Sequence, residues 1–298
     1  MSIIKKHEES CSKGFAHYRA DPNDLSYIES SLEFMQSGKN IGGACANVSD
    51  FYKSKGILNW FKNKNLDVLK QDFYVAAKSE IIGSIVRNQP HYESSHKLYA
   101  LLCDNEEIMS WYMQDVGALY DSFGKGAQRN KINSFDYYKF NFFLAAQGYW
   151  DLLAARSKYI LENPPIKKYQ AEATHHVFYL ALAKGNFAGM KAAIDDIISP
   201  KKLHKQNMSG CPIPRFFISY WGTLFAKLAW RYGYELEFNN PWIPQEWLPV
   251  KPLESYENPH DFLKTDIYIP YICEFANYSP QKDKVNWLDL AEGSWPPI

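Results

Sequence analysis

The sequence contains a few groups of side chains whose types could bind a metal or support catalysis, so their spacing decides what they can do. "HYESSH" holds His91, Glu93 and His96. Two histidines five residues apart lie poorly on one helical face, and the HExxH arrangement of zinc enzymes is missing. His175 and His176 are adjacent, so on a helix they point about 100° apart. We predict no metal site at either place, and we expect a polar core or surface position for one of the paired histidines.

Phosphate-binding and nucleophilic patterns are equally incomplete. "SFGKGAQ" (residues 122–128) lacks the Gly five residues before Lys125 and the following Ser or Thr of a phosphate-binding loop, so we interpret it as a flexible turn between helices. Cys211 lies at an expected helix entry, where a thiolate is favoured, with His204 seven residues earlier. The acid pairs 106–107 and 195–196 are explained as solvated helix charges. We predict no catalytic, cofactor-binding or metal-binding residue.

Composition limits the class of protein. The 298 residues carry 33 basic and 33 acidic side chains, which gives no overall attraction to nucleic acid or to an acidic membrane. From residue 239 to the end there are nine acids and four bases, leaving 24 acids and 29 bases before it. The acidic end either lies against the basic body or offers a surface to a basic partner.

Cysteine usage and hydropathy indicate the compartment. The five cysteines form no CxxC pair, which argues against a disulfide framework and a zinc knuckle and favours a reducing environment. The first residues lack the apolar core of a signal peptide. The most apolar stretch, residues 216–230, is too short to span a bilayer and contains Lys227. We expect a cytoplasmic protein that binds neither membranes nor nucleic acid directly.

Helical periodicity recurs along the first 235 residues and predicts an all-α fold. Residues 65–86 are expected to form a helix with one apolar face. The apolar positions are Leu66, Leu69, Phe73, Ala76 or Ala77, Ile81 and Ile85, and the charged positions expected off that face are Lys70, Asp72, Lys78 and Glu80. Residues 94–120 predict one or two helices, with a break near residues 104–105. Residues 214–233 predict one central helix, begun by Pro214 and ended by Gly233.

A repeat lies within residues 135–200. With Gly148 aligned to Gly185, a shift of 37 residues, Trp150 meets Phe187 and Leu153 meets Met190. The shared pattern of helix, glycine turn, aromatic residue and second helix predicts two similar helical hairpins, with the aromatic side chain filling the elbow. Two copies are fewer than the three or more repeats that usually make a solenoid, so a helical body with two hairpins and an open repeat array both remain possible.

The chain changes character after residue 238. "NNPWIPQEWLPVKPLESYE" (residues 239–257) contains four prolines, which forbid a long helix and hold the preceding residues extended; at most one turn fits "PQEWL". We predict a helical body over residues 1–238 and an extended, acidic strap over residues 239–298, packed together as one unit. The predicted apolar anchors of the strap are Trp242, Ile243, Trp247, Leu248 and Leu253.

The region from about residue 135 to residue 263 resembles a known family. The glycine-turn hairpins, "FAKLAWRYGYELEF" and above all "IPQEWLPVKPL" (residues 243–253) are similar to the bacterial polymorphic-toxin immunity protein 49 family. The resemblance implies a mostly helical, non-enzymatic protein that protects its own cell by binding a cognate toxin. It carries over no catalytic residue, and the first 130 residues share with it only their helical character.

The resemblance and the charge asymmetry together suggest a partner and a contact surface. We expect a cytoplasm-acting protein toxin, for example a basic nuclease, to be neutralised by occlusion. The expected contact residues mix acids with tyrosines, as interfaces do: Glu254, Tyr256, Glu257, Asp261, Asp266 and Tyr268. The alternative is a helical-repeat adaptor that binds a peptide or regulatory partner in the groove of its hairpins. An enzyme with an unrecognised, non-local site is the third possibility.

Overall fold

The computed structural model describes residues 2–17, 21–86, 97–112, 130–203 and 214–264, and all regular structure within these ranges is helical. The all-α prediction is therefore confirmed. The chain divides into two units, one made of Met1–Trp111 with Ile197–Tyr271 and the other of Tyr112–Asp196 with Ile272–Ile298. The boundary expected at residue 238 does not coincide with this division, because residues 239–264 pack among helices of the first unit.

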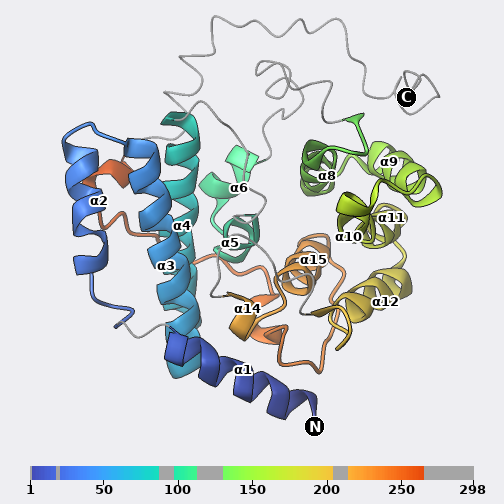
Figure 1. The fold of residues 1–298 in the computed structure, drawn as a ribbon, viewed down its shortest axis with the longest axis horizontal. Helices are drawn as coiled ribbons and strands as arrows, with labels where there is room; N and C mark the ends of the chain where they lie inside the picture. The colour runs from blue at the N-terminus through green and yellow to red at the C-terminus, as the bar shows by residue number, and fades with distance from the viewer. Residues whose placement is uncertain (1, 18–20, 87–96, 113–129, 204–213, 265–298) are drawn as a thin grey trace, which may run out of the picture. The chain divides into compact units, whose positions relative to one another are not determined.

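The first unit is built around two long antiparallel helices. α3 (Ile41–Asn63) and α4 (Leu66–Val86) lie side by side (Figure 1). Lys64 adopts a left-handed conformation and donates its N–H to the Trp60 carbonyl, which ends α3, and the Asn65 side chain caps α4 by accepting from the Val68 N–H. The other elements of the unit are α1 (Ile3–His17), α2 (Ser26–Gln36), α5 (Lys97–Leu102), α6 (Glu106–Tyr112), α14 (Pro214–Phe217), α15 (Tyr220–Arg231) and the 3₁₀ turns η4 (Gln245–Trp247) and η5 (Asp261–Lys264).

The charged side chains that lie off the apolar face of α4 are not exposed to solvent. Lys70, Asp72, Lys78 and Glu80 are all at least 95% buried. Each has a partner of opposite charge on another element: Asp104, Lys55, Glu107 and Lys53, respectively. Helical periodicity shows that these charged side chains lie off the apolar face of α4. It cannot show that segments distant in the sequence cover them.

The expected helix over residues 214–233 is interrupted. It is split into α14 and α15 at residues 218–219. The Ser219 side chain accepts a hydrogen bond from the Gly222 N–H and so caps α15, while its own N–H donates to the Trp242 carbonyl at 2.8 Å. The break thus ties the strap to the start of α15, a contact that lies outside the reach of local sequence patterns. The helix ends where it was expected to end, because Gly233 has φ +79°, a left-handed conformation that follows the last turn of α15.

The second unit contains the two similar hairpins. They are formed by α8 (Phe135–Gln147) with α9 (Trp150–Glu162), and by α11 (His176–Ala183) with α12 (Phe187–Ile197); η3 (Lys167–Tyr169) and α10 (Gln170–Ala173) lie between them. Gly148 and Gly185 both have positive φ and close the same pair of backbone hydrogen bonds, to residues 145 and 144 and to residues 182 and 181. The alignment at 37 residues therefore corresponds to one turn geometry used twice.

The aromatic residues after these turns differ in their packing. Trp150 is half-buried and lies against Gly148, whereas Phe187 is 48% exposed. The expected elbow-filling role therefore fits the first hairpin better than the second. Behind the turns the paired positions do match, since Leu153 and Met190 are both fully buried.

The first half of the strap packs into the core of the first unit as predicted. Trp242, Ile243, Trp247 and Leu248 are at most 1% exposed, and Leu253 is half-buried. The Trp247 ring makes edge contacts with the rings of Trp60, Phe61 and Phe73, so it joins α3 to α4. The single turn allowed by the prolines is present as η4.

Candidate functional site

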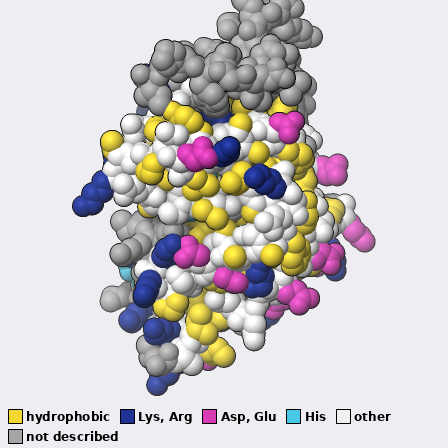
Figure 2. All heavy atoms as spheres, turned by 90° about the vertical axis from the view of Figure 1, so that its right-hand side faces the viewer, with side chains coloured by type: hydrophobic (Ala, Val, Ile, Leu, Met, Phe, Trp, Pro, Cys, Tyr) yellow, Lys and Arg dark blue, Asp and Glu magenta, His cyan; other side chains and the backbone are white. Residues whose placement is uncertain are grey.

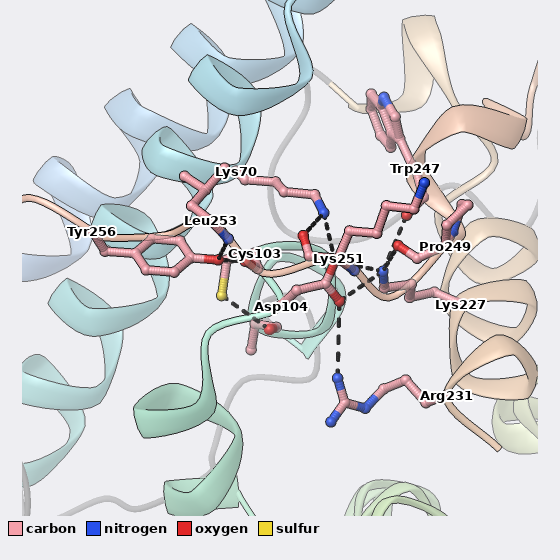
Figure 3. Close-up of polar contacts among 11 residues, drawn as sticks. Lys70, Cys103, Asp104, Lys227, Arg231, Trp247, Pro249, Lys251, Leu253 and Tyr256 are labelled. Atoms are coloured by element: carbon pink, nitrogen blue, oxygen red, sulfur yellow. Dashed lines mark hydrogen bonds and ion pairs between the residues drawn. The ribbon is translucent and has the colours of Figure 1, made fainter.

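A buried charged cluster lies where the strap crosses α4, α5 and α15, and we call Lys70, Asp104 and Lys227 the hub (Figure 3). Asp104 is in the break between α5 and α6 and has φ +56°, a left-handed conformation that Asp tolerates better than most residues. The Asn105 side chain caps α6 by accepting from the Ile108 N–H. The break predicted near residues 104–105 is confirmed, and it directs a carboxylate into the core.

Two ammonium groups hold this carboxylate. Lys70 Nζ is 2.8 Å from Asp104 Oδ2, and Lys227 Nζ is 2.7 Å from Oδ1. The guanidinium of Arg231, which is partly exposed, is 3.9 Å away. The side chains of Lys227 and Asp104 are completely buried. Burial on this scale requires a paired charge and further hydrogen bonds.

The strap supplies those hydrogen bonds through its main chain. Lys227 Nζ donates to the carbonyls of Trp247 at 3.2 Å and Pro249 at 3.0 Å. Lys70 Nζ donates to the Lys251 carbonyl, and the Lys251 N–H donates to Asp104 Oδ2 at 3.2 Å. Figure 3 shows these groups converging from the strap, α4, the α5–α6 break and α15.

Burial changes the acid–base properties of the hub. Desolvation lowers the pKa of Lys227 to about 8, although the adjacent Asp104 carboxylate opposes the shift. Desolvation also raises the pKa of the neighbouring Cys103 thiol to about 12, so this cysteine is a poor nucleophile at neutral pH. All the charged groups of the hub bind each other or the strap. The arrangement is suited to holding a segment of the chain in place.

The predicted contact residues fall into two classes. Glu254, Glu257 and Asp261 are exposed. Tyr256 is half-buried instead, and its hydroxyl donates to the Cys103 carbonyl and accepts from the Leu253 N–H. Asp266 and Tyr268 lie outside the described residues, as do His91, Glu93, His96, Lys125, His204 and Cys211. The structure thus brings acids to the surface and turns Tyr256 inward.

A second buried polar network, in the second unit, was not predicted. Arg156 donates to Asn141 and, through Nη1, to Asn130 at 2.9 Å, and its guanidinium lies 4.1 Å from the centre of the Tyr137 ring. His176 is 3.3 Å from the Ser157 hydroxyl. Desolvation holds the pKa of His176 well below its usual value.

Apart from the half-buried Asn130, the residues of this network are enclosed. Ser157 and His176 have no exposed surface and Arg156 is 1% exposed, so this serine–histidine contact packs α9 against α11. His175, its neighbour in sequence, is also buried. Both histidines therefore belong to the core.

Asp72 carries a testable electrostatic signature. Its carboxylate is 3.0 Å from Lys55, yet desolvation outweighs that pair and raises its pKa from 3.8 to about 6. The folded state therefore binds this proton more tightly than the unfolded state. The resulting stability is fully present below pH 3.8 and is lost as pH rises to about 6.

We expect the free energy of unfolding of an Asp72→Asn variant, measured by urea denaturation from pH 4 to 7, to fall less with rising pH than that of the parent chain. Asp151→Asn, at an exposed position of α9, removes one carboxylate of the same type from the surface and provides the matched control. Parallel curves for the parent chain and Asp72→Asn would contradict the assignment.

Within the described residues, no group of three or more His, Cys, Asp or Glu side chains is arranged to hold a metal ion. In the same ranges, no helix combines the length and apolar character needed to cross a bilayer. Comparisons with protein families, with known proteins and with solved structures found no match to this chain.

Proposed function

We propose that this chain is an immunity protein that binds a cognate cytoplasmic protein toxin and neutralises it by occlusion. The observation that carries the proposal is the placement of residues 243–253. This stretch bears the most specific part of the family resemblance, and it is the stretch that the aromatic core and the hub hold in a defined conformation. A rigid surface lowers the entropic cost of binding a partner.

The exposed side of the strap offers a candidate contact surface. Glu254, Glu257 and Asp261 extend from it into solvent, and exposed acids favour fast association with a basic partner. Because Tyr256 points inward, the proposed surface consists of these three acids and excludes its ring.

The first test is identification of the partner. We expect the native protein, purified from its own cell, to carry one stoichiometric protein partner that mass spectrometry identifies. That partner should arrest growth when it is produced alone and should be harmless when this chain is produced with it. Several substoichiometric peptides, or a partner without toxicity, would contradict the proposal.

The contact surface has its own prediction. Replacing Glu254, Glu257 and Asp261 together with lysine should weaken toxin binding at least tenfold, because attraction to a basic surface becomes repulsion. Titration calorimetry with the purified toxin measures the effect. The matched control replaces Glu9, Glu29 and Glu33, which are exposed acids on α1 and α2, and produces the same change in net charge. Equal affinities for the two triple variants would exclude this surface while leaving toxin binding itself intact.

The matched hairpins favour a second candidate, a helical-repeat adaptor. Their glycine turns share one geometry. Figure 2, which looks onto the side where α9, α11 and α12 lie in Figure 1, shows hydrophobic side chains among charges of both signs. The exposed apolar side chains on the elements of this unit include Tyr149, Leu161, Ile166, Val177 and Phe187. The test is purification of the chain with whatever it binds. If a peptide partner comes with the parent chain but not with a variant in which Val177 and Phe187 are replaced by serine, the adaptor is favoured over the immunity protein.

A further inference from the structure

The described part of the strap contains two segments that are held in different ways. The anchor segment, residues 242–248, inserts four apolar side chains that are at most 1% exposed. The flap, residues 249–264, has one fully buried apolar side chain, Leu263, while Val250 is 42% exposed and Leu253 is half-buried. Since a fully buried large apolar side chain contributes about 1.5–3 kcal/mol, the flap is held much less strongly by apolar burial.

The flap is held mainly by hydrogen bonds between side chains of the helical body and the main chain of the flap. Gln71 on α4 forms a pair of hydrogen bonds with the backbone of Glu257: its amide Nε2 donates to the carbonyl at 2.9 Å, and its Oε1 accepts from the N–H at 3.0 Å. Lys70 and Asp104 form the equivalent pair with the carbonyl and N–H of Lys251. Two side-chain pairs thus bind the extended backbone much as a neighbouring strand would.

Side chains of the flap make further contacts beside these pairs. The Tyr256 ring packs against the Tyr74 ring with centroids 4.9 Å apart, and its hydroxyl donates to the Cys103 carbonyl. Tyr74 also donates to the Asn258 side chain at 3.0 Å. Farther along, the Tyr52 hydroxyl is 2.9 Å from His260 Nε2.

We propose that the surface formed by Tyr52, Gln71, Tyr74 and the α5–α6 break is a peptide-binding groove, occupied in this state by the chain's own flap. The ligand that fits is an extended peptide with a tyrosine at the position of Tyr256, a residue with a free N–H directly after it, and an apolar residue seven positions beyond the tyrosine. A tethered segment acts at an effective concentration of roughly millimolar, so an external peptide binds only when the flap is loosened. This inference does not depend on the toxin proposal.

The test uses a fluorescent peptide of residues 249–264 and the full chain. Tyr256→Ala combined with Leu263→Ala loosens the flap without altering the groove. We expect this variant to bind the peptide at least tenfold more tightly than the unaltered chain does, as measured by fluorescence anisotropy. Adding Gln71→Ala to the variant, or proline at the position of Glu257 in the peptide, should weaken binding at least tenfold. Equal peptide affinity of the unaltered and loosened chains would overturn the proposal. So would unchanged affinity when Gln71→Ala is added to the loosened chain and when the peptide carries the proline.

Hydrogen exchange on the unaltered chain provides a measurement that does not depend on the folding of a variant. The amides of Lys251 and Glu257, whose acceptors are the Asp104 and Gln71 side chains, should exchange at least tenfold faster than those of Trp247 and Leu248 after correction for intrinsic rates. This difference is expected because the flap opens while the anchor segment stays in place. Exchange of all four amides at one common protection factor would show that the strap opens as a whole and would overturn the proposal.

Discussion

Replacing Asp104 with asparagine is expected to lower the free energy of unfolding by about 3–5 kcal/mol, the usual loss when one partner of a buried ion pair is removed. Asparagine keeps the shape of the side chain and tolerates the left-handed backbone at this position, so the change removes little besides the charge. Lys70 and Lys227 would then be two buried ammonium groups without their carboxylate. Urea denaturation at pH 7 measures the loss.

The matched control for this prediction is Asp195→Asn. Asp195 forms an ion pair with Lys191 at 2.9 Å on the exposed surface of α12, and exposed pairs of this type contribute about 0.3–0.5 kcal/mol. A loss at Asp104 no larger than the loss at Asp195 would show that the hub contributes little to stability. A loss several times larger would support its role in fixing the strap.

Truncating Trp247 to alanine is expected to cost about 3–5 kcal/mol, as large aromatic truncations in a core do. Its indole ring is 1% exposed and contacts the rings of Trp60, Phe61 and Phe73. The substitution leaves a cavity between α3 and α4 that these rings can fill only in part. Thermal and urea denaturation should show a lower midpoint, and protease should cut within residues 242–253 faster than it does in the parent chain.

Val250 provides the control for the same strap. Its side chain is 42% exposed, and surface substitutions of this kind usually change stability by less than about 0.5 kcal/mol. The Val250→Ala variant should therefore have the same denaturation midpoint as the parent chain. If Trp247→Ala also matched the parent chain, residues 242–248 would not be part of the core.

Local signals predicted the parts of the fold that depend on neighbouring residues. Helical periodicity identified α4, prolines predicted the extended strap, and the glycines at 148 and 185 predicted two turns that prove to share one geometry. The apolar anchors Trp242 and Trp247 were identifiable because large rings rarely accompany disordered, proline-rich linkers.

The hub could not be predicted in the same way. Asp104 is 34 residues from Lys70 and 123 residues from Lys227, so no spacing pattern connects them. A charged residue within a helical pattern is normally assigned to solvent, and that rule failed for Lys70, Asp72, Lys78 and Glu80 on α4. Lys227 gave one signal, as the single charged residue within the apolar stretch 216–230.

The discontinuity of the first unit has a consequence for biosynthesis. Its opening helices, up to Trp111, belong with a segment that begins at Ile197, and Trp242 and Trp247 complete their core. A ribosome therefore releases α3 and α4 long before their aromatic partners exist, and the rings of Trp60, Phe61 and Phe73 lack Trp247 while the second unit is made. Contacts between residues so far apart in the sequence form late, which slows folding and prolongs the exposure of apolar surface. The nascent chain is therefore expected to depend on chaperones until its last quarter emerges.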